Sequence, residues 1–109
     1  MAVTAEDIAF VRDLFSGLPA LTTRKMFGGL SVYSERQIFA IIGPENRIYI
    51  KASGPLAEAL AAEGGAQFVY EGKEKTASMG YWTLPESALD GPDEATDWAR
   101  RALDAAARV

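Results

Sequence analysis

The chain contains neither cysteine nor histidine. Without cysteine it has no disulfide, no thiol nucleophile and no thiolate ligand for zinc. Without histidine it has no imidazole to act as the general base of a Ser-His-Asp triad. Because these absences remove the commonest catalytic arrangements, we expect a non-enzymatic protein with no catalytic residues, no metal site and no cofactor.

Long hydrophobic runs are also absent. No apolar stretch approaches the ~18 residues that a membrane-spanning helix needs. The first residues, Met-Ala-Val-Thr-Ala-Glu-Asp, lack the basic segment and the apolar segment of a secretory signal peptide. We therefore expect a cytoplasmic protein that has no membrane partner.

The formal net charge is -4, which argues against a surface that binds nucleic acid directly. The charge is unevenly distributed along the chain. Residues 21–51 carry five cations and two anions, a balance of 5 - 2 = +3, so the other residues together carry -4 - 3 = -7. The cations of this segment are Arg24, Lys25, Arg36, Arg47 and Lys51. They could form a local basic face, or they could be separate charges on solvated strand surfaces.

The length of 109 residues and the hydrophobic content of 49% are typical of one globular domain with one core. We see no internal repeat, low-complexity tract or linker. We therefore treat residues 1–109 as a single domain.

Hydrophobic periodicity predicts three helices and six strands. The first helix begins at Thr4 and is stopped by Gly17 and Pro19; the second is opened by Pro55 and ended by Gly64; the third begins at Pro92. Alternating or continuous apolar runs predict strands over 21–27, 30–33, 37–42, 47–51, 67–70 and 79–84, with a charged hairpin loop over 71–78. The result is an α+β fold in two layers, in the order α-β-β-β-β-α-β-β-α, with one mainly antiparallel sheet and helices mainly on one side.

The segment Arg24-Lys25-Met26-Phe27-Gly28-Gly29 joins the first two predicted strands. Its glycines and cations could cradle an anionic group. A phosphate-binding loop, however, gains strength from a helix that starts directly after it, and here a strand follows. The other interpretation is a kinked strand or a hairpin whose glycines avoid a steric clash.

Five pieces of the chain, in order, resemble the N-terminal domain of TfoX, a competence-regulator family also called Sxy. They are Arg24-x-Met26-Phe27-Gly28-Gly29 with Val32-Tyr33, then Phe39-Ala40, then Arg47-Ile48-Tyr49-Ile50-Lys51, then Tyr81-Trp82-x-Leu84-Pro85-Glu86, and finally Trp98-Ala99-Arg100-x-Ala102-Leu103. The resemblance covers roughly residues 5–106. Ser31 departs from it, because the family usually has a third glycine there.

The resemblance implies a stand-alone regulatory domain that acts on transcription through a protein partner. The candidate contact residues are Arg24, Lys25, Phe27, Gly28, Gly29, Lys51 and Tyr81. Tyr81 and Trp82 should lie on opposite faces of the sheet, one in the core and the other exposed. The alternative hypothesis is a domain that binds a small anionic ligand or a nucleotide at Gly28 and Gly29, and pairing of sheet edges into a homodimer is a further hypothesis.

Overall fold

The computed structural model describes residues 4–26, 29–43, 47–71 and 76–107, with side chains except those of residues 26, 69–71, 76–79 and 107. The elements are α1 (Ala5–Leu14), β1 (Leu21–Met26), β2 (Gly29–Ser34), β3 (Gln37–Ile42), β4 (Ile48–Lys51), α2 (Gly54–Ala62), β5 (Gln67–Glu71), β6 (Thr76–Thr83), the short 3-10 helix η2 (Glu86–Asp90) and α3 (Pro92–Ala107). This order confirms the predicted α+β arrangement. The predicted loop over 71–78 was too long, because Glu71 and residues 76–78 belong to strands.

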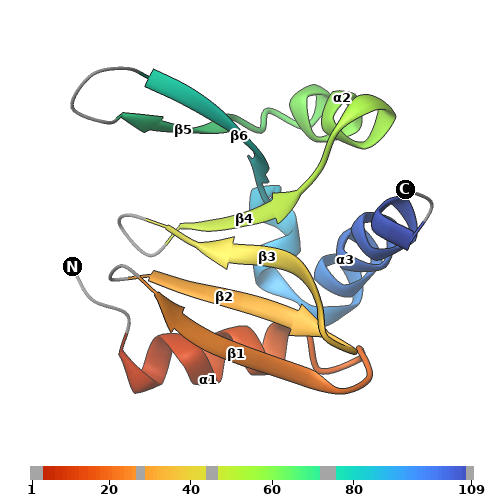
Figure 1. The fold of residues 1–109 in the computed structure, drawn as a ribbon. Helices are drawn as coiled ribbons and strands as arrows, with labels where there is room; N and C mark the ends of the chain where they lie inside the picture. The colour runs from red at the N-terminus through yellow and green to blue at the C-terminus, as the bar shows by residue number, and fades with distance from the viewer. Residues whose placement is uncertain (1–3, 27–28, 44–46, 72–75, 108–109) are drawn as a thin grey trace.

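The strands form one six-stranded sheet in the order β1-β2-β3-β4-β6-β5, and every neighbouring pair is antiparallel. The first four strands follow one another as a meander, as their short connections predict. After β4 the chain passes through α2 to β5 at the far edge, and β6 then returns between β4 and β5 (Figure 1). β1 and β5 are therefore the two edges of the sheet.

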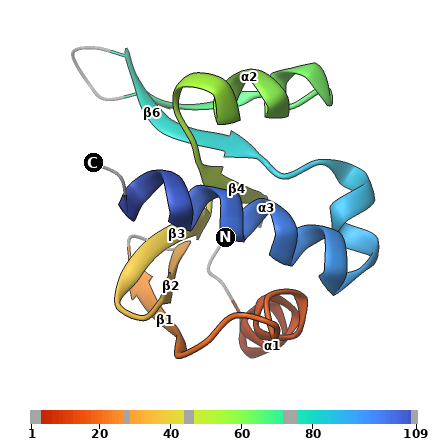
Figure 2. The same cartoon turned by 90° about the vertical axis from the view of Figure 1, so that its right-hand side faces the viewer.

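The helices cover one face of the sheet. In Figure 1, β1 and β2 pass in front of α1, and in Figure 2 the strands of the meander lie to the left of α1. α3 packs on β3 and β4. In the core between these layers, Leu30, Val32 and Ile50 of the sheet pack with the alanine-rich side of α3. Trp98 is the large side chain that α3 adds to this core. We call the other side of the sheet the helix-free face.

A bulge in β3 adds a large side chain to this core. Val32 pairs with Ala40, but the next residue of β2, Tyr33, pairs with Ile38, so Phe39 is an extra residue in β3. Strict alternation would place Phe39 and Ala40 on opposite faces, whereas a bulge can bring two successive residues to one side. Phe39 is fully buried, and its ring meets that of Phe15 edge to face with centroids 5.1 Å apart.

The ends of α1 fix its position against α3. Thr4, where the sequence predicts the helix to begin, caps it in a capping box with Asp7. The helix ends at Leu14, three residues before the glycine that was expected to stop it. Gly17 lies so close to α3 that a Cβ there would be 3.2 Å from the methyl carbon of Thr96, so the glycine permits this approach. The Thr96 hydroxyl donates to the Leu14 carbonyl oxygen at 3.4 Å.

Candidate functional site

The helix-free face carries aromatic rings and cations on neighbouring strands. The register aligns Arg24 with Ser31, Ser31 with Ile41, and Ile41 with Tyr49. Residues aligned in this way share a face of the sheet. By the same alternation, the face also carries Tyr33, Lys51 and Tyr81.

Ser31 and Ile41 form the floor of this face. Ser31 is fully buried and Ile41 is 6% exposed, although none of the described helices covers this face. The Tyr33 hydroxyl lies 3.5 Å from the Ser31 hydroxyl, so the tyrosine side chain reaches back over the serine. The Ser31 hydroxyl in turn donates to the Arg24 carbonyl oxygen at 3.3 Å. The serine that departs from the family pattern is thus part of this polar contact.

A second group of rings lies further along the face. The rings of Tyr49 and Phe68 are tilted against each other with centroids 4.9 Å apart. Gly43 lies beside both of them, and a Cβ at Gly43 would come within 3.0 Å of the Tyr49 ring. Such a contact is tighter than most real Cβ contacts, so a side chain at Gly43 would require the Tyr49 ring to shift.

Tyr81 is half-buried on the same face, next to Lys51 in the register. Burial raises the pKa of the Tyr81 phenol, and the nearby Tyr33 phenol raises that pKa further. At physiological pH the Tyr81 phenol stays neutral and can both donate and accept a hydrogen bond.

The charge of the helix-free face differs from that of the molecule. Arg24 and Lys51 are exposed there, and the strand residues described on this face include no aspartate and no glutamate. The whole chain, by contrast, carries a net charge of -4. The face thus combines half-buried rings with positive charge, and both arginine and aromatic residues are enriched at binding hot spots.

The predicted contact residues are only partly brought together. Arg24, Lys51 and Tyr81 share the helix-free face, whereas Lys25 aligns with Leu30 and therefore lies on the helix side of β1. Gly29 pairs with Met26 at the start of β2, so a strand, not a helix, follows the glycines. Phe27 and Gly28 lie outside the described residues. As predicted, Trp82 and Tyr81 separate, and Trp82 packs on the core.

Sequence reasoning missed three aromatic residues of the face: Tyr33, Tyr49 and Phe68. Tyr33 and Tyr49 could have been found by carrying the alternation from Arg24 through the predicted hairpins. Phe68 gave no such signal, because its contact with Tyr49 depends on the insertion of β6 between β4 and β5.

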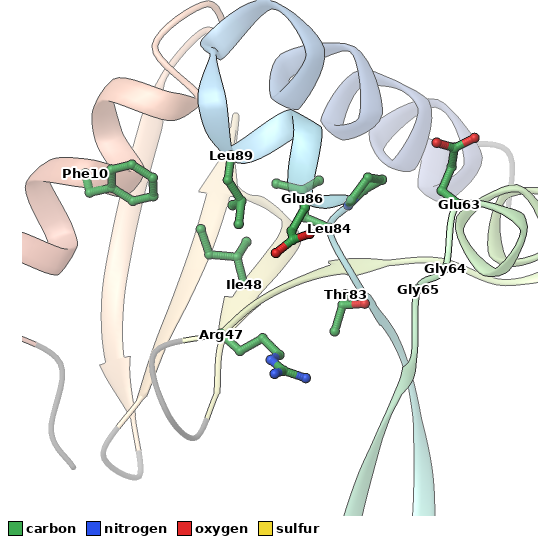
Figure 3. Close-up of a pocket in the computed structure, with 11 residues that line it drawn as sticks. Phe10, Arg47, Ile48, Glu63, Gly64, Gly65, Thr83, Leu84, Glu86 and Leu89 are labelled. Atoms are coloured by element: carbon green, nitrogen blue, oxygen red, sulfur yellow. The ribbon is translucent and has the colours of Figure 1, made fainter.

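A separate hollow of about 480 Å³ lies at one end of the sheet. Phe10, Leu89 and Ile48 gather at one end of it, and Glu63 lies at the other (Figure 3). Phe10 and Leu89 are also exposed large hydrophobic residues in the part of the chain that the structure describes. Among the described residues, the lining includes no serine, cysteine or lysine, and the hydroxyl of Thr83 accepts a hydrogen bond from the Ala66 amide. The described lining thus combines apolar side chains with charges of both signs.

Within the described residues, no three acidic side chains are grouped so that they could hold a metal ion. None of the helices in the same part of the chain combines the length and the apolar character needed to cross a bilayer.

Comparison with known proteins agrees with the resemblance seen in the sequence. The family described as the TfoX N-terminal domain matches residues 13–106, which include the whole sheet and most of the helices. No curated protein matches the chain. Since the matched residues make up most of the chain and its fold is the α+β fold expected from the resemblance, the chain belongs to the TfoX N-terminal domain family.

Proposed function

We propose that the protein is a non-enzymatic regulatory module that binds a protein partner through its helix-free face. The observation that supports this most is the combination on one face of Arg24, Lys51 and half-buried aromatic side chains, without a carboxylate among the described strand residues there. The family resemblance suggests transcriptional regulation as the process in which such a module would act, and the lack of a signal-peptide pattern suggests the cytoplasm as the place.

An acidic protein surface fits this face better than a nucleic acid does. A protein that depends strongly on the DNA backbone makes roughly 6–10 phosphate contacts. Each contact makes the slope of log binding constant against log salt concentration steeper by about 0.9. Within its described strand residues the face offers two cations, Arg24 and Lys51. Two contacts are enough to orient an acidic protein but too few to hold a nucleic-acid backbone tightly. We therefore keep direct nucleic-acid binding as the less favoured hypothesis.

The alternative of a small anionic ligand at Gly28 and Gly29 gains no support from the described residues. Gly29 begins β2, so the amides after it are committed to a strand ladder and are not gathered at a helix N-terminus. Arg24 and Lys25 also lie on opposite sides of β1. This hypothesis therefore stays a prediction.

A capture experiment tests the proposed function. The immobilised domain is exposed to an extract of its source cells, as wild type and as the double variant Arg24→Ala/Lys51→Ala. A matched control, Arg12→Ala/Arg36→Ala, removes two exposed cations from α1 and from the turn between β2 and β3. We expect the captured protein to be lost with the face variant and kept with the control.

Equal capture by all three proteins would contradict the proposal. So would captured material that disappears after nuclease treatment, because nucleic acid would then be the ligand. Thermal unfolding of each variant should show that the substitutions of these exposed side chains leave the fold intact.

A further inference from the structure

β1 is an edge strand whose outer side is open within the described part of the chain. It comes first in the sheet order and pairs only with β2, over six aligned residue pairs without a register shift. Its residues Thr22, Arg24 and Lys25 are exposed. A strand of this length and regularity presents a row of backbone groups to which another chain can pair.

One hydrogen bond shows which backbone N–H and C=O groups of β1 point toward β2 and which point outward. The Glu35 amide donates to the Ala20 carbonyl oxygen at 3.3 Å, so these two residues form a hydrogen-bonded pair just outside the strands. In an antiparallel ladder such pairs alternate. Thr22 and Arg24 therefore bond to β2, and Leu21, Thr23 and Lys25 direct their N–H and C=O groups outward.

The two edges of the sheet differ in how they are protected. Bulges and irregular pairing discourage the addition of a strand. β5, the other edge, has a register shift between Gln67 and Val69. β1 has no shift, proline or bulge, so it is the edge better suited to accept a strand.

The charges beside this edge select the kind of strand that fits. β1 contains Arg24 and Lys25 but no acidic residue. The two cations are consecutive, so one stands on the helix-free face and the other on the helix side. Successive residues of an added strand also point to opposite faces. Two consecutive carboxylates would thus meet one cation each.

We infer that β1 accepts an extended acidic segment of the protein partner as a seventh strand, with two adjacent carboxylates beside Arg24 and Lys25. This inference rests on the proposed function, since it names the part of the partner that meets the helix-free face. The added strand would extend that face past Arg24 and place alternate partner side chains on it.

A second copy of the chain fits this edge less well. Two β1 strands paired around a two-fold axis would bring the cations of both copies together. They would also bring the two α1 helices together, because α1 lies on the helix side at the β1 end of the sheet in both views (Figures 1 and 2). Pairing would place the two β1 strands about 4.8 Å apart, whereas the axes of two packed helices need to be about 8–10 Å apart. An extended acidic segment brings no second helix and no like charges to the edge.

The test uses the whole chain, labelled with nitrogen-15, and a synthetic peptide, Thr-Val-Thr-Asp-Glu-Val-Thr-Val, with blocked ends. Amide hydrogen exchange is measured with and without saturating peptide. We expect the amides of Leu21, Thr23 and Lys25 to exchange about tenfold more slowly or better, since new hydrogen bonds protect them. The amides of Thr22 and Arg24, which already bond to β2, serve as internal controls and should change little.

Charge reversal provides the matched control. A peptide with Lys-Lys in place of Asp-Glu should bind at least about tenfold more weakly, and the variant Arg24→Glu/Lys25→Glu should reverse this preference. Absence of binding by the acidic peptide overturns the inference. So does peptide binding that shifts the signals of Tyr49 and Lys51 without protecting the outward amides, although this second result would leave the proposed face in place.

A dimer would overturn the inference in a different way. If sedimentation shows a mass twice that of the chain, and Arg24→Glu changes that mass, then β1 pairs with a second copy. The capture experiment is independent of all these results, so failure at the edge can be told from failure of the proposed function.

Discussion

The pKa of the Tyr81 phenol depends on its environment on the helix-free face. The phenol is half-buried beside Lys51, and both burial and Tyr33 raise its pKa. The charged form is therefore less favourable in the folded protein than in the unfolded chain. A group with a raised folded pKa contributes stability that is fully present below its unfolded pKa, and this contribution is lost as the pH rises through the folded pKa.

We predict that Tyr81→Phe reduces the alkaline loss of stability. Between neutral pH and about pH 11, above the ordinary tyrosine pKa, the unfolding temperature should fall more steeply for the wild type than for the variant. In an alkaline titration followed by tyrosinate absorbance, the wild type should show one tyrosine that ionises at higher pH than a free tyrosine. Tyr81→Phe should lack that step. Identical pH profiles for the two proteins would show that Tyr81 is not held in a buried environment.

At the scale of elements, the bulge in β3 decides which side chains enter the core. Because Phe39 is an additional residue, it turns toward Phe15 and shares the core with Ala40. Burial of a large aromatic side chain is among the strongest single contributions to stability. Phe39 and Phe10 differ in this respect, since Phe39 is fully buried and Phe10 is 47% exposed.

We predict that Phe39→Ala lowers the free energy of unfolding by about 3–5 kcal/mol, the usual cost of removing a buried phenylalanine. The matched control Phe10→Ala removes the same atoms from a half-exposed position and should cost about 1 kcal/mol or less. Denaturant unfolding measures both costs, provided that the free energy of unfolding falls with denaturant concentration at the same slope in all three proteins. A similar cost for the two variants would mean that the bulge does not place Phe39 in the core.

Much of this architecture could be predicted from the sequence, because it depends on local patterns. Alternation and the positions of proline and glycine predict the element types and their order, including the start of the first helix at Thr4. The bulge at Phe39 and the insertion of β6 between β4 and β5 could not be predicted, since they depend on packing between segments far apart in the chain. The site shows the same division. The residues Arg24, Lys51 and Tyr81 were predicted to share a surface and do, whereas Lys25 lies on the other side of its strand.

At the scale of the whole molecule, two surfaces compete as the contact site. The helix-free face carries positive charge and aromatic rings in a chain of net charge -4. The hollow at the end of the sheet carries the exposed apolar side chains of Phe10 and Leu89, with charges of both signs around them. We propose that the helix-free face is the recognition surface, because arginine and half-buried aromatic residues are typical binding anchors.

The most direct test is the dissociation constant of the captured partner, measured by titration calorimetry with two double variants. Arg24→Ala/Lys51→Ala alters the helix-free face, and Phe10→Ala/Leu89→Ala alters the hollow. We predict that the face variant weakens binding by about tenfold or more, which corresponds to about 1.4 kcal/mol, and that the hollow variant stays within about twofold of the wild type. A weakening confined to the hollow variant, with the face variant at wild-type affinity, would contradict the account.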